Sequence, residues 1–382
     1  MPDISVIVPT LNERGNLLPL VTDLCSVLSG MDYEIMIVDD DSEDGTASYA
    51  RQMAQRETRI RVIQRMGRRG LSSAVVEGML ASSSPVLAVI DADGQHDPSI
   101  LPAMCETLKS KNLDLVIGSR ACEGGSMGEF ASERVALSRL GRGLSRAVCR
   151  AEVLDPMSGY FVVTRKYVEE VVHSLSCTGF KILLDLLASA ERPVRFAEVA
   201  YRFRLRRQGE SKLNVVVALE FFELLLDKLV GRWLPVRYVI FGCIGGLGVL
   251  ISAAMLFALL RWAHLDFASA QAIDGAVVIG LNFALNNRLT FRAFRLRGRQ
   301  LVAGFAIFFA GCSLGLLANL AIALALLRSG VPWYFAGLTG IIVGSLWNYW
   351  MSCLFVWKVA QHRRRVRQLA SQSTAESAVS LQ

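Results

Sequence analysis

The chain has 382 residues, which is long enough for two domains. Hydrophobic residues make up 52% of it, and the formal net charge is +7. Eight cysteines are scattered without a Cys-x-x-Cys pair or a Cys/His ligand spacing, which argues against a disulfide framework and a zinc site. Much of the positive charge flanks apolar runs in the second half, so no nucleic-acid partner is needed to explain it.

Short apolar runs alternate with amphipathic stretches in the first half of the chain. Five runs rich in β-branched residues are expected to be strands: 4–10, 33–42, 59–65, 86–93 and 113–120. The stretches 15–30 and 45–57 have helical spacing. Strands this apolar, alternating with helices, predict a mainly parallel sheet covered on both faces. No signal peptide is expected, because "MPDISVIVPTLNE" reads as a strand and a loop.

Acidic residues follow three of the expected strands. Glu13 comes after the first, Asp39–Asp41 after the second, and Asp91 and Asp93 after the fourth. The carboxyl ends of parallel strands meet at one edge of a sheet, where α/β proteins bind ligands. Carboxylates are the ligands that Mg²⁺ or Mn²⁺ prefer, often together with substrate phosphates. We therefore expect a shared site for a divalent ion and a diphosphate.

Two common phosphate-binding loops are missing from the sequence. There is no GxxxxGK[ST] motif, and no GxGxxG follows the first strand, which disfavours a P-loop hydrolase and a dinucleotide enzyme. A diphosphate bridged by a metal remains, and a nucleotide-sugar is such a compound. Two other acids have simpler interpretations, since Asp44 is expected in a turn and Asp97, before Pro98, at a helix cap.

Eight motifs in a fixed order resemble one enzyme family. They are "VIVPTLNERGNL", "IVDDDSEDGT", "GLSSAVVEG", "DADGQHDP", "IGSR", "DPMSGYFVVTRK", "GFKILLDLL" and "RRQGESKL". Together, over roughly residues 3–215, they resemble the polyprenol-phosphate glycosyltransferases, above all dolichol-phosphate mannose synthases. The resemblance implies a GT-A fold and inverting, metal-dependent transfer of mannose from GDP-mannose to a polyprenyl (dolichyl or undecaprenyl) phosphate. A UDP-sugar donor, as in a glucosyltransferase, stays open as the alternative.

The resemblance also implies roles for individual residues. The implied nucleotide-sugar pocket consists of Pro9, Leu11, Glu13, Val38, Asp39, Asp40, Asp91, Asp93 and Gln95. The implied ligands of Mg²⁺ or Mn²⁺ are Asp91, Asp93 and Gln95, and the implied catalytic residues are Asp91, Asp93 and Arg206. Many relatives have Tyr where Leu11 stands, and Gly94 replaces a common Leu.

A lipid phosphate as acceptor needs cations and no general base, because its oxygen is already anionic at neutral pH. Arginine suits bidentate phosphate contact, and lysine acts as a point charge. The expected acceptor-phosphate residues are Arg120, Arg134, Ser138, Arg206, Ser211 and Lys212, of which Arg134 and Ser138 follow from the resemblance. A protein O-glycosyltransferase would need a base and a peptide groove, and no segment indicates either. A catalytically silent transporter or scaffold is disfavoured by the intact acidic and basic sets.

Two stretches are expected to lie along a membrane surface. In "SERVALSRLGRGLSRAVCR", Arg142 and Arg146 share a basic helical face, which suits an anionic membrane or, alternatively, open solvent. In "LNVVVALEFFELLLDKLV", three acidic residues form one stripe on an otherwise apolar helix. This second helix is expected in the plane of the interface, between the catalytic domain and the bilayer.

The second half predicts a four-helix membrane domain. Four apolar runs reach the roughly 20 residues that a bilayer span requires: 238–260, 267–287, 301–327 and 331–357. Their layout resembles the small GtrA-like membrane domain. The arginine-rich segments 286–300 and 358–367 predict a multi-pass protein of the inner membrane with both termini and the catalytic domain in the cytoplasm.

The expected organisation has four parts. They are a catalytic domain at 1–212, an interface helix at 213–236, a membrane domain at 237–360 and a basic, disordered tail at 361–382. Within the membrane domain, Asn282 precedes Phe291 by the same nine residues that separate Asn348 from Trp357. This spacing hints at two duplicated hairpins. The sequence is also compatible with a homo-oligomer.

Overall fold

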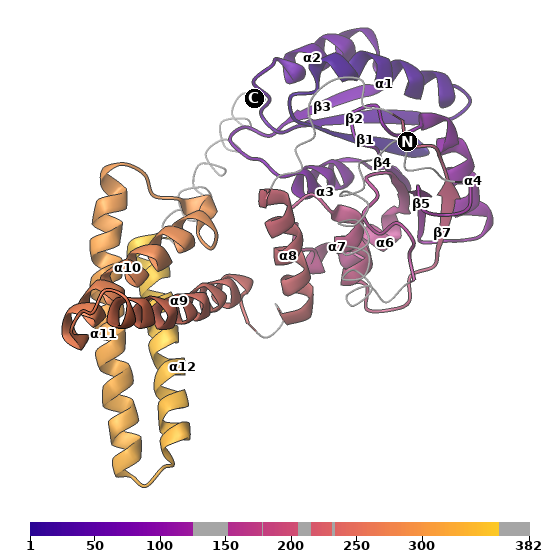
Figure 1. The fold of residues 1–382 in the computed structure, drawn as a ribbon. Helices are drawn as coiled ribbons and strands as arrows, with labels where there is room; N and C mark the ends of the chain where they lie inside the picture. Colours follow the sequence, from indigo (N-terminus) through magenta and orange to yellow (C-terminus); the bar gives the residue numbers. More distant parts are fainter. Residues whose placement is uncertain (125–151, 178, 205–214, 231–233, 359–382) are drawn as a thin grey trace, which may run out of the picture. The chain divides into compact units, whose positions relative to one another are not determined.

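A computed structural model describes residues 1–124, 152–177, 179–204, 215–230 and 234–358 of the chain (Figure 1). The chain divides into two compact units, Met1–Arg232 and Trp233–Gln382. The first unit mixes strands and helices, and the second is helical in its described part.

The first unit contains all five predicted strands, each within its predicted run, and two strands that the sequence analysis did not predict. Its strands are β1 (Ile4–Thr10), β2 (Tyr33–Asp39), β3 (Ile60–Gln64), β4 (Val86–Val89), β5 (Leu115–Ser119), β6 (Phe161–Thr164) and β7 (Phe196–Ala200). The helices among its described residues are α1 (Arg14–Val27), α2 (Thr46–Arg56), α3 (Leu71–Ala81), α4 (Leu101–Ser110), α6 (Arg165–Val171), α7 (Ile182–Ser189) and α8 (Val215–Val230), with short 3₁₀ turns at Pro98–Ile100 and Val172–Ser174.

The seven strands form one sheet in the order β3-β2-β1-β4-β6-β5-β7. All neighbours are parallel except β6, which runs antiparallel to both β4 and β5. The sheet is therefore mainly parallel, as predicted, with one reversed strand inserted. Because β1, β2, β4 and β5 run the same way, their carboxyl ends lie at one edge, where ligands bind in such sheets.

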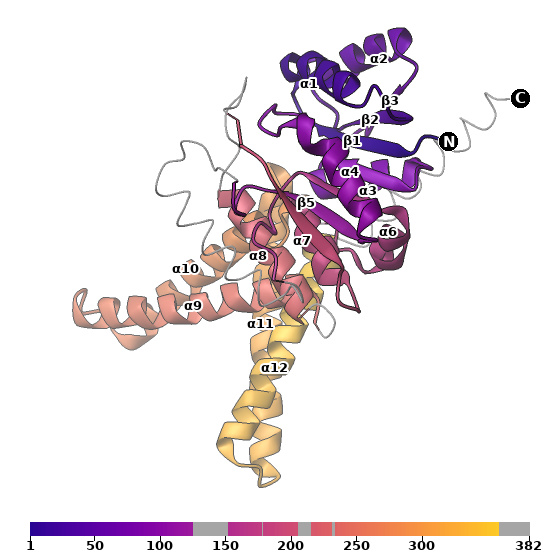
Figure 2. The same cartoon turned by 90° about the vertical axis from the view of Figure 1, so that its right-hand side faces the viewer.

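Each face of the sheet has its own hydrophobic core, because successive strand residues point to opposite faces. Val6 and Val8 of β1 belong to the core that α1 and α4 cover. Ile7, between them, belongs to the core covered by α3, α6 and α7. At the β3 side of the sheet, α2 packs on β3 and contacts α1 (Figure 2).

The second unit places a helix in each of the four predicted apolar runs. They are α9 (Val236–Arg261), α10 (Phe267–Arg288), α11 (Arg299–Arg328) and α12 (Trp333–Met351), the last continuing as a π-helical turn, Ser352–Val356. α9 packs against α10, and α11 forms a long hairpin with α12 (Figure 1). Among the described residues, α9 and α11 are long and apolar enough to cross a membrane.

The two hairpins repeat one packing detail. A Cβ atom added to Gly248 of α9 would lie 2.7 Å from Oδ1 of Asn282 on α10. A Cβ atom added to Gly315 of α11 would lie 3.1 Å from Cγ of Asn348 on α12. In each hairpin an asparagine of the second helix thus packs directly against a glycine of the first.

The hairpins also end alike. The amide of Phe291 donates to the carbonyl of Asn286, five residues earlier, and the amide of Trp357 donates to that of Ser352, also five residues earlier. The rings of Phe291 and Trp357 stack on each other, with centroids 4.1 Å apart and planes 7° from parallel. The predicted duplication therefore has a structural counterpart in packing and in chain ends.

Candidate active site

The predicted pocket residues of β1 and β2 lie side by side at the carboxyl edge of the sheet. Pro9 pairs in register with Val38, and both are buried. Leu11, just beyond β1, is half-buried. Glu13 accepts a hydrogen bond from Nδ2 of Asn16 at 2.7 Å, which orients its carboxylate at the start of α1.

Protein groups hold the carboxylates of Asp39 and Asp40. Asp39 is fully buried and accepts hydrogen bonds from Thr10 Oγ1 at 3.0 Å and from Ser42 Oγ at 2.6 Å. Asp40 is buried in an ion pair with Arg65 and accepts the amide of Gly70 at 2.6 Å. Both residues therefore fix the loop that follows β2.

Asp91 is the least satisfied acid of the site. Its Oδ2 lies 3.5 Å from Nε2 of His96. Its Oδ1 is buried and has no hydrogen-bond partner within the described ranges. The backbone of Gly159 approaches closely, since a Cβ there would lie 2.7 Å from Cγ of Asp91. A buried carboxylate oxygen without a donor is costly, which marks this position as one that a cation would satisfy.

A tight turn brings Asp93 and Gln95 to the same edge. Gly94 has φ +74°, a left-handed conformation that glycine adopts without strain, and the amide of Gln95 donates to Asp93 Oδ1 at 3.1 Å. The Gln95 side chain donates to the carbonyl of Arg204 at 3.3 Å, and the Arg204 amide donates back to the Gln95 carbonyl at 2.8 Å. The turn is thereby tied to the segment after β7.

Two acids have the simple structural roles that the sequence predicted, Asp97 as a cap and Asp44 in a turn. Asp97 accepts the amide of Ser99 at 3.0 Å and caps the 3₁₀ turn before α4. Asp44 accepts the amides of Arg14 at 3.1 Å and Thr46 at 3.0 Å in the loop before α2. These predictions are confirmed.

His96 is a site residue that the sequence analysis missed. It is 3% exposed and packs among the rings of Tyr160, Tyr201 and Phe203 at 5.5, 5.6 and 5.5 Å. Its Nδ1 lies 2.7 Å from the hydroxyl of Tyr201. Burial raises the pKa of Tyr201, so its hydroxyl stays protonated and shares this hydrogen bond with Nδ1, while Nε2 faces Asp91. The sequence signal was His96 itself, within "DADGQHDP".

Arg120 does reach the site, and its guanidinium is paired there. Its Nε and a terminal nitrogen donate to the two oxygens of Asp155 at 2.7 and 2.9 Å, and its backbone amide donates at 3.2 Å. Burial alone would raise the pKa of Asp155, but the hydrogen bonds and charge of Arg120 lower it below its usual value. The guanidinium also lies 5.0 Å from the centroid of the Phe203 ring.

Lys181, just before α7, is a second residue that the sequence analysis missed. Its Nζ donates to the carbonyl of Met157 at 3.1 Å. Burial and the charge of Arg120 lower its pKa to about 8, although Asp91 and Asp155 act in the opposite direction. Its ammonium therefore lies in the electrostatic environment that these three groups share. The signal was the Lys of "GFKILLDLL", which sequence alone could not distinguish from an exposed lysine.

Five of the predicted acceptor-phosphate residues lie outside the described residues: Arg134, Ser138, Arg206, Ser211 and Lys212. The predicted basic amphipathic stretch from residue 132 falls there as well. Of the expected acceptor-phosphate residues, the described part of the chain thus contains Arg120.

The acids and the amide suit a hard divalent cation in chemistry. No group of three or more His, Cys, Asp or Glu side chains within the described residues is arranged to hold a metal ion. Asp91, Asp93 and Gln95 would offer two carboxylates and an amide oxygen, so a diphosphate and water would complete the ligand shell. Mg²⁺ bound with substrate phosphates commonly has such incomplete protein ligation.

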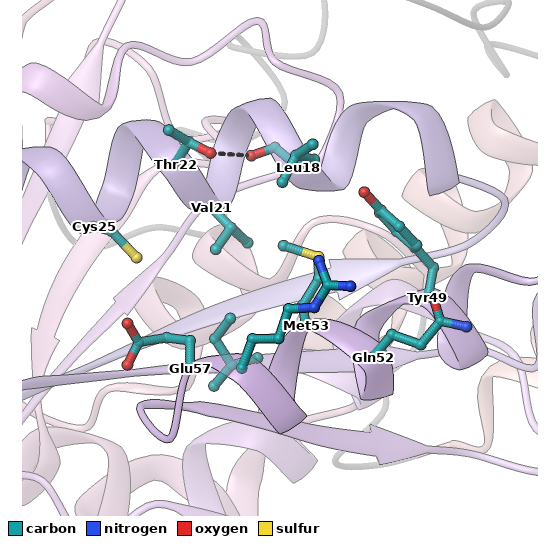
Figure 3. A pocket seen from close by; sticks show the side chains of 10 residues that line it. Leu18, Val21, Thr22, Cys25, Tyr49, Gln52, Met53 and Glu57 are labelled. Atoms are coloured by element: carbon teal, nitrogen blue, oxygen red, sulfur yellow. Dashed lines mark hydrogen bonds between the residues drawn. The ribbon is translucent and has the colours of Figure 1, made fainter.

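A cavity of about 420 Å³ lies elsewhere, between α1 and α2 (Figure 3). Leu18, Val21 and Thr22 line it from α1, and Tyr49 and Met53 from α2. It extends toward Ile60, the first residue of β3, and shares no residue with the site described above. The cavity is therefore distinct from the strand-end site.

Comparisons with known proteins match a different family model to each of the two units. Residues 5–172 match the model of glycosyl transferase family 2, and residues 240–357 match the GtrA/DPMS transmembrane domain. A dolichol-phosphate mannosyltransferase of Pyrococcus furiosus is 32% identical over 344 residues, covering 89% of this chain and 95% of that protein. The one of Mycosarcoma maydis is 35% identical over 271 residues, covering 69% and 88%.

Among solved structures, glucosyl-3-phosphoglycerate synthase from Mycobacterium tuberculosis, in complex with Mn²⁺, UDP-glucose and phosphoglyceric acid, has a TM-score of 0.45 and 22% identity. The match covers 59% of this chain and 79% of that one. The chain is thus a membrane protein with a glycosyltransferase unit and a GtrA/DPMS transmembrane domain. It belongs to the family 2 glycosyltransferases, in the group of the dolichol-phosphate mannosyltransferases.

Proposed function

We propose that the protein transfers mannose from GDP-mannose to the phosphate of a polyprenyl lipid, with inversion and with Mg²⁺ or Mn²⁺. The observation that carries this proposal is the buried Oδ1 of Asp91, which has no hydrogen-bond partner among the described residues and lies near the cations Arg120 and Lys181. Such a site suits a metal-bound diphosphate and a second anion. The relatives' name, dolichol-phosphate mannosyltransferase, supports this sugar and this class of acceptor.

On the donor side, the protein binds and orients a sugar diphosphate. Asp91, Asp93 and Gln95 would hold the divalent ion, which neutralises charge on the departing diphosphate. The fixed loops after β1 and β2, with Pro9 and Val38 at their base, form the surface for the nucleotide. Nε2 of His96 contacts the carboxylate of Asp91 while Nδ1 is hydrogen-bonded to Tyr201, so the fixed imidazole ring holds Asp91 in place.

On the acceptor side, the reaction needs no proton transfer. An oxygen of the lipid phosphate attacks the anomeric carbon, and the bond from that carbon to the diphosphate oxygen breaks with its electron pair. Attack from the face opposite the leaving group converts an α-linked donor into a β-linked product. The guanidinium of Arg120 and the ammonium of Lys181 stabilise the two anions that must approach each other.

The acceptor must share Arg120 with Asp155. An arginine has five N–H donors, and three contacts to Asp155 use its Nε, one terminal nitrogen and the backbone amide. The other terminal nitrogen can therefore contact a phosphate while Asp155 keeps the guanidinium in position.

For the membrane unit we propose four spans, with both termini and the catalytic unit in the cytoplasm of a cell with an inner membrane. The arginine-rich connection between α10 and α11 supports this orientation, since cytoplasmic loops are enriched in Lys and Arg. This arrangement would keep the catalytic unit at the face of the bilayer where nucleotide-sugars are made.

The donor can be identified in one experiment. Purified protein in detergent is incubated with Mn²⁺ or Mg²⁺, a short polyprenyl phosphate and GDP-mannose, UDP-glucose or UDP-N-acetylglucosamine in parallel. We expect sugar-phosphate lipid from GDP-mannose, and loss of product when EDTA removes the metal. Product from UDP-glucose alone would replace the mannosyl proposal with the glucosyl alternative, and no lipid product from any donor would refute both.

The variant Asp93→Ala tests whether this carboxylate belongs to the proposed metal site. The variant removes one of two carboxylates at the proposed ion, so transfer should fall by at least about 100-fold. Asp97→Ala, which removes only a cap and an exposed ion pair, is the matched control and should retain transfer. Undiminished transfer by a folded Asp93→Ala protein would remove Asp93 from the site.

A further inference from the structure

Helix α8 is fastened to α7 by a buried lysine. The Nζ of Lys228 lies 2.6 Å from Asp185 Oδ1, and it donates to Ser189 Oγ at 2.7 Å and to the carbonyl of Ser174 at 2.9 Å. A lysine ammonium has three N–H donors, so each one has an acceptor. The Lys228 side chain is 9% exposed and that of Asp185 is 0% exposed. We call Ser174, Asp185 and Ser189 the Lys228 socket.

Asp185 also fixes the turn that leads toward the site. Its oxygens accept the amide of Ser176 at 3.2 Å, the Ser176 hydroxyl at 3.0 Å and the amide of Cys177 at 3.0 Å. Cys177 has φ +51°, an unfavourable conformation for a residue with a side chain, so this turn depends on its hydrogen bonds. Without Lys228, the buried carboxylate of Asp185 would keep these hydrogen bonds but lose its ion pair.

Asp185 stands in the first turn of α7, which begins directly after Lys181 of the active site. The amide of Asp185 donates to the carbonyl of Lys181 at 3.1 Å, which is the first helical hydrogen bond of α7. The side chain of Lys181 in turn donates to Met157, in the loop that carries Asp155, the partner of Arg120. A short covalent and hydrogen-bonded path therefore joins Lys228 to the two cations of the site.

α8 also makes apolar contacts with α7. Leu224 and Leu225 pack on Leu184 of α7, on the side of Lys228. Phe222 and Leu229, seven residues apart and so on one helical face, are 49% and 54% exposed. α8 therefore packs on α7 through apolar residues beside Lys228 and exposes two large apolar side chains on a second face.

We propose that Lys228 is a positioning residue: by filling its socket it sets the start of α7, and with it Lys181 and the Asp155 loop, for sugar transfer. This inference rests on the proposed function, because it concerns the rate of transfer to the lipid phosphate. Lys228 itself touches neither substrate. Its effect passes through Asp185 to Lys181.

The test compares Lys228→Met, which keeps much of the side-chain volume but removes the charge, with Lys228→Arg, which keeps the charge. The matched control is Asp114→Asn, at a buried carboxylate paired with Arg192 and Arg195 at the amino end of β5, the edge opposite the site. Transfer is measured at saturating donor and lipid phosphate, together with KM for the donor, the stoichiometry of nucleoside-diphosphate binding and the melting temperature.

We expect Lys228→Met to lower kcat by about 10- to 100-fold, as misplacement of a catalytic group does, while the KM for donor stays within about twofold. Its binding stoichiometry should equal that of the wild type, which excludes a smaller folded fraction. Lys228→Arg should recover most of kcat. Asp114→Asn should lower the melting temperature but leave kcat within about twofold of wild type.

Wild-type kcat in a folded Lys228→Met protein would overturn the proposal, as would equal losses of kcat in Lys228→Met and Asp114→Asn. If Lys228→Met does not fold, Ser189→Ala removes one of the three acceptors and should still lower kcat at unchanged KM; an unchanged kcat in Ser189→Ala would then overturn the proposal. A wild-type protein without lipid product would instead refute the proposed function, so the two failures are distinguishable.

Discussion

Asp91 shows how closely its surroundings constrain a single side chain at the strand-end site. One oxygen faces the Nε2 of a buried histidine, and the other is buried without a donor among the described residues. The third constraint is steric, because the backbone of Gly159 leaves no room for a side chain next to the carboxylate. Preorganised groups of this kind act on developing charge without having to reorient during the reaction.

Gly159→Ala tests that steric constraint. The added methyl would lie 2.7 Å from Cγ of Asp91, so either the carboxylate or the backbone must move, and transfer should fall by about tenfold or more. Steady-state assays at saturating donor measure the effect. Gly30→Ala, where a Cβ meets nothing within 4 Å, is the control and should have normal activity. Full activity in Gly159→Ala would show that the position of Asp91 is not critical.

Lys181 predicts a pH dependence. Its pKa is lowered to about 8, so the free enzyme has the ammonium below that pH and loses it as the pH rises. Because the charge stabilises bound anions, kcat/KM for the donor should fall through about pH 8, since kcat/KM reports ionisations of the free enzyme.

Lys181→Arg provides the comparison, because arginine keeps its charge throughout this range. The alkaline decline should disappear in this variant even if its maximal activity is lower. Lys166→Arg, at an exposed lysine of α6, should leave the profile unchanged. An identical alkaline decline in Lys181→Arg would assign it to another group.

At the scale of elements, the sheet was easier to predict than the site. β1 to β5 are short, apolar, β-branched runs, and that local signal was sufficient. β6 was missed because its four residues lie within a motif and pair antiparallel with two strands far away in sequence. β7 was missed because its residues are only half-buried and lack a continuous apolar run.

The same contrast between local signals and contacts of distant residues applies to the site. Acids placed directly after strands, such as Asp91, could be predicted from local sequence and strand direction. The contacts of His96 with Tyr201, and of Arg120 with Asp155, join residues 105 and 35 positions apart, and no periodicity encodes them. The sequence therefore predicted which residue types meet, but not that Arg120 is already paired or that Lys181 faces inward.

The glycine–asparagine contacts of the two membrane hairpins give a prediction at this scale. Gly248→Leu and Gly315→Leu would each force a helix away from the asparagine that it contacts, at an expected cost of about 1–3 kcal/mol. Thermal unfolding in detergent, followed by the melting temperature, measures this cost. Gly246→Leu, on α9 with nothing within 4 Å of an added Cβ, is the control and should not be destabilised. Equal stability of all three variants would show that the repeated contact does not hold the hairpins together.

At the scale of the whole molecule, the two units suit the two kinds of substrate that the proposed reaction requires. The first unit has acids at its strand ends beside two cations, where we propose that a sugar diphosphate binds, and the second matches a transmembrane domain. A water-soluble donor and a membrane-borne acceptor are the substrates that such a chain would bring together. The ion pair between Lys228 of α8 and Asp185 of α7 fixes the last described helix of the first unit. In sequence, this helix comes directly before the second unit.

The central claim is that a lipid phosphate, and not a hydroxyl, attacks the sugar without a general base. The most direct measurement is the rate of mannose transfer from GDP-mannose to polyprenyl phosphate and to the matching polyprenol, with products identified by mass spectrometry. We predict a mannosyl-phosphate lipid from the first acceptor and no product from the second, because the proposed reaction binds a phosphate through Arg120 and Lys181 and assigns Asp91 and Asp93 to the metal, not to the deprotonation of an alcohol. Comparable glycosylation of the polyprenol would contradict this account.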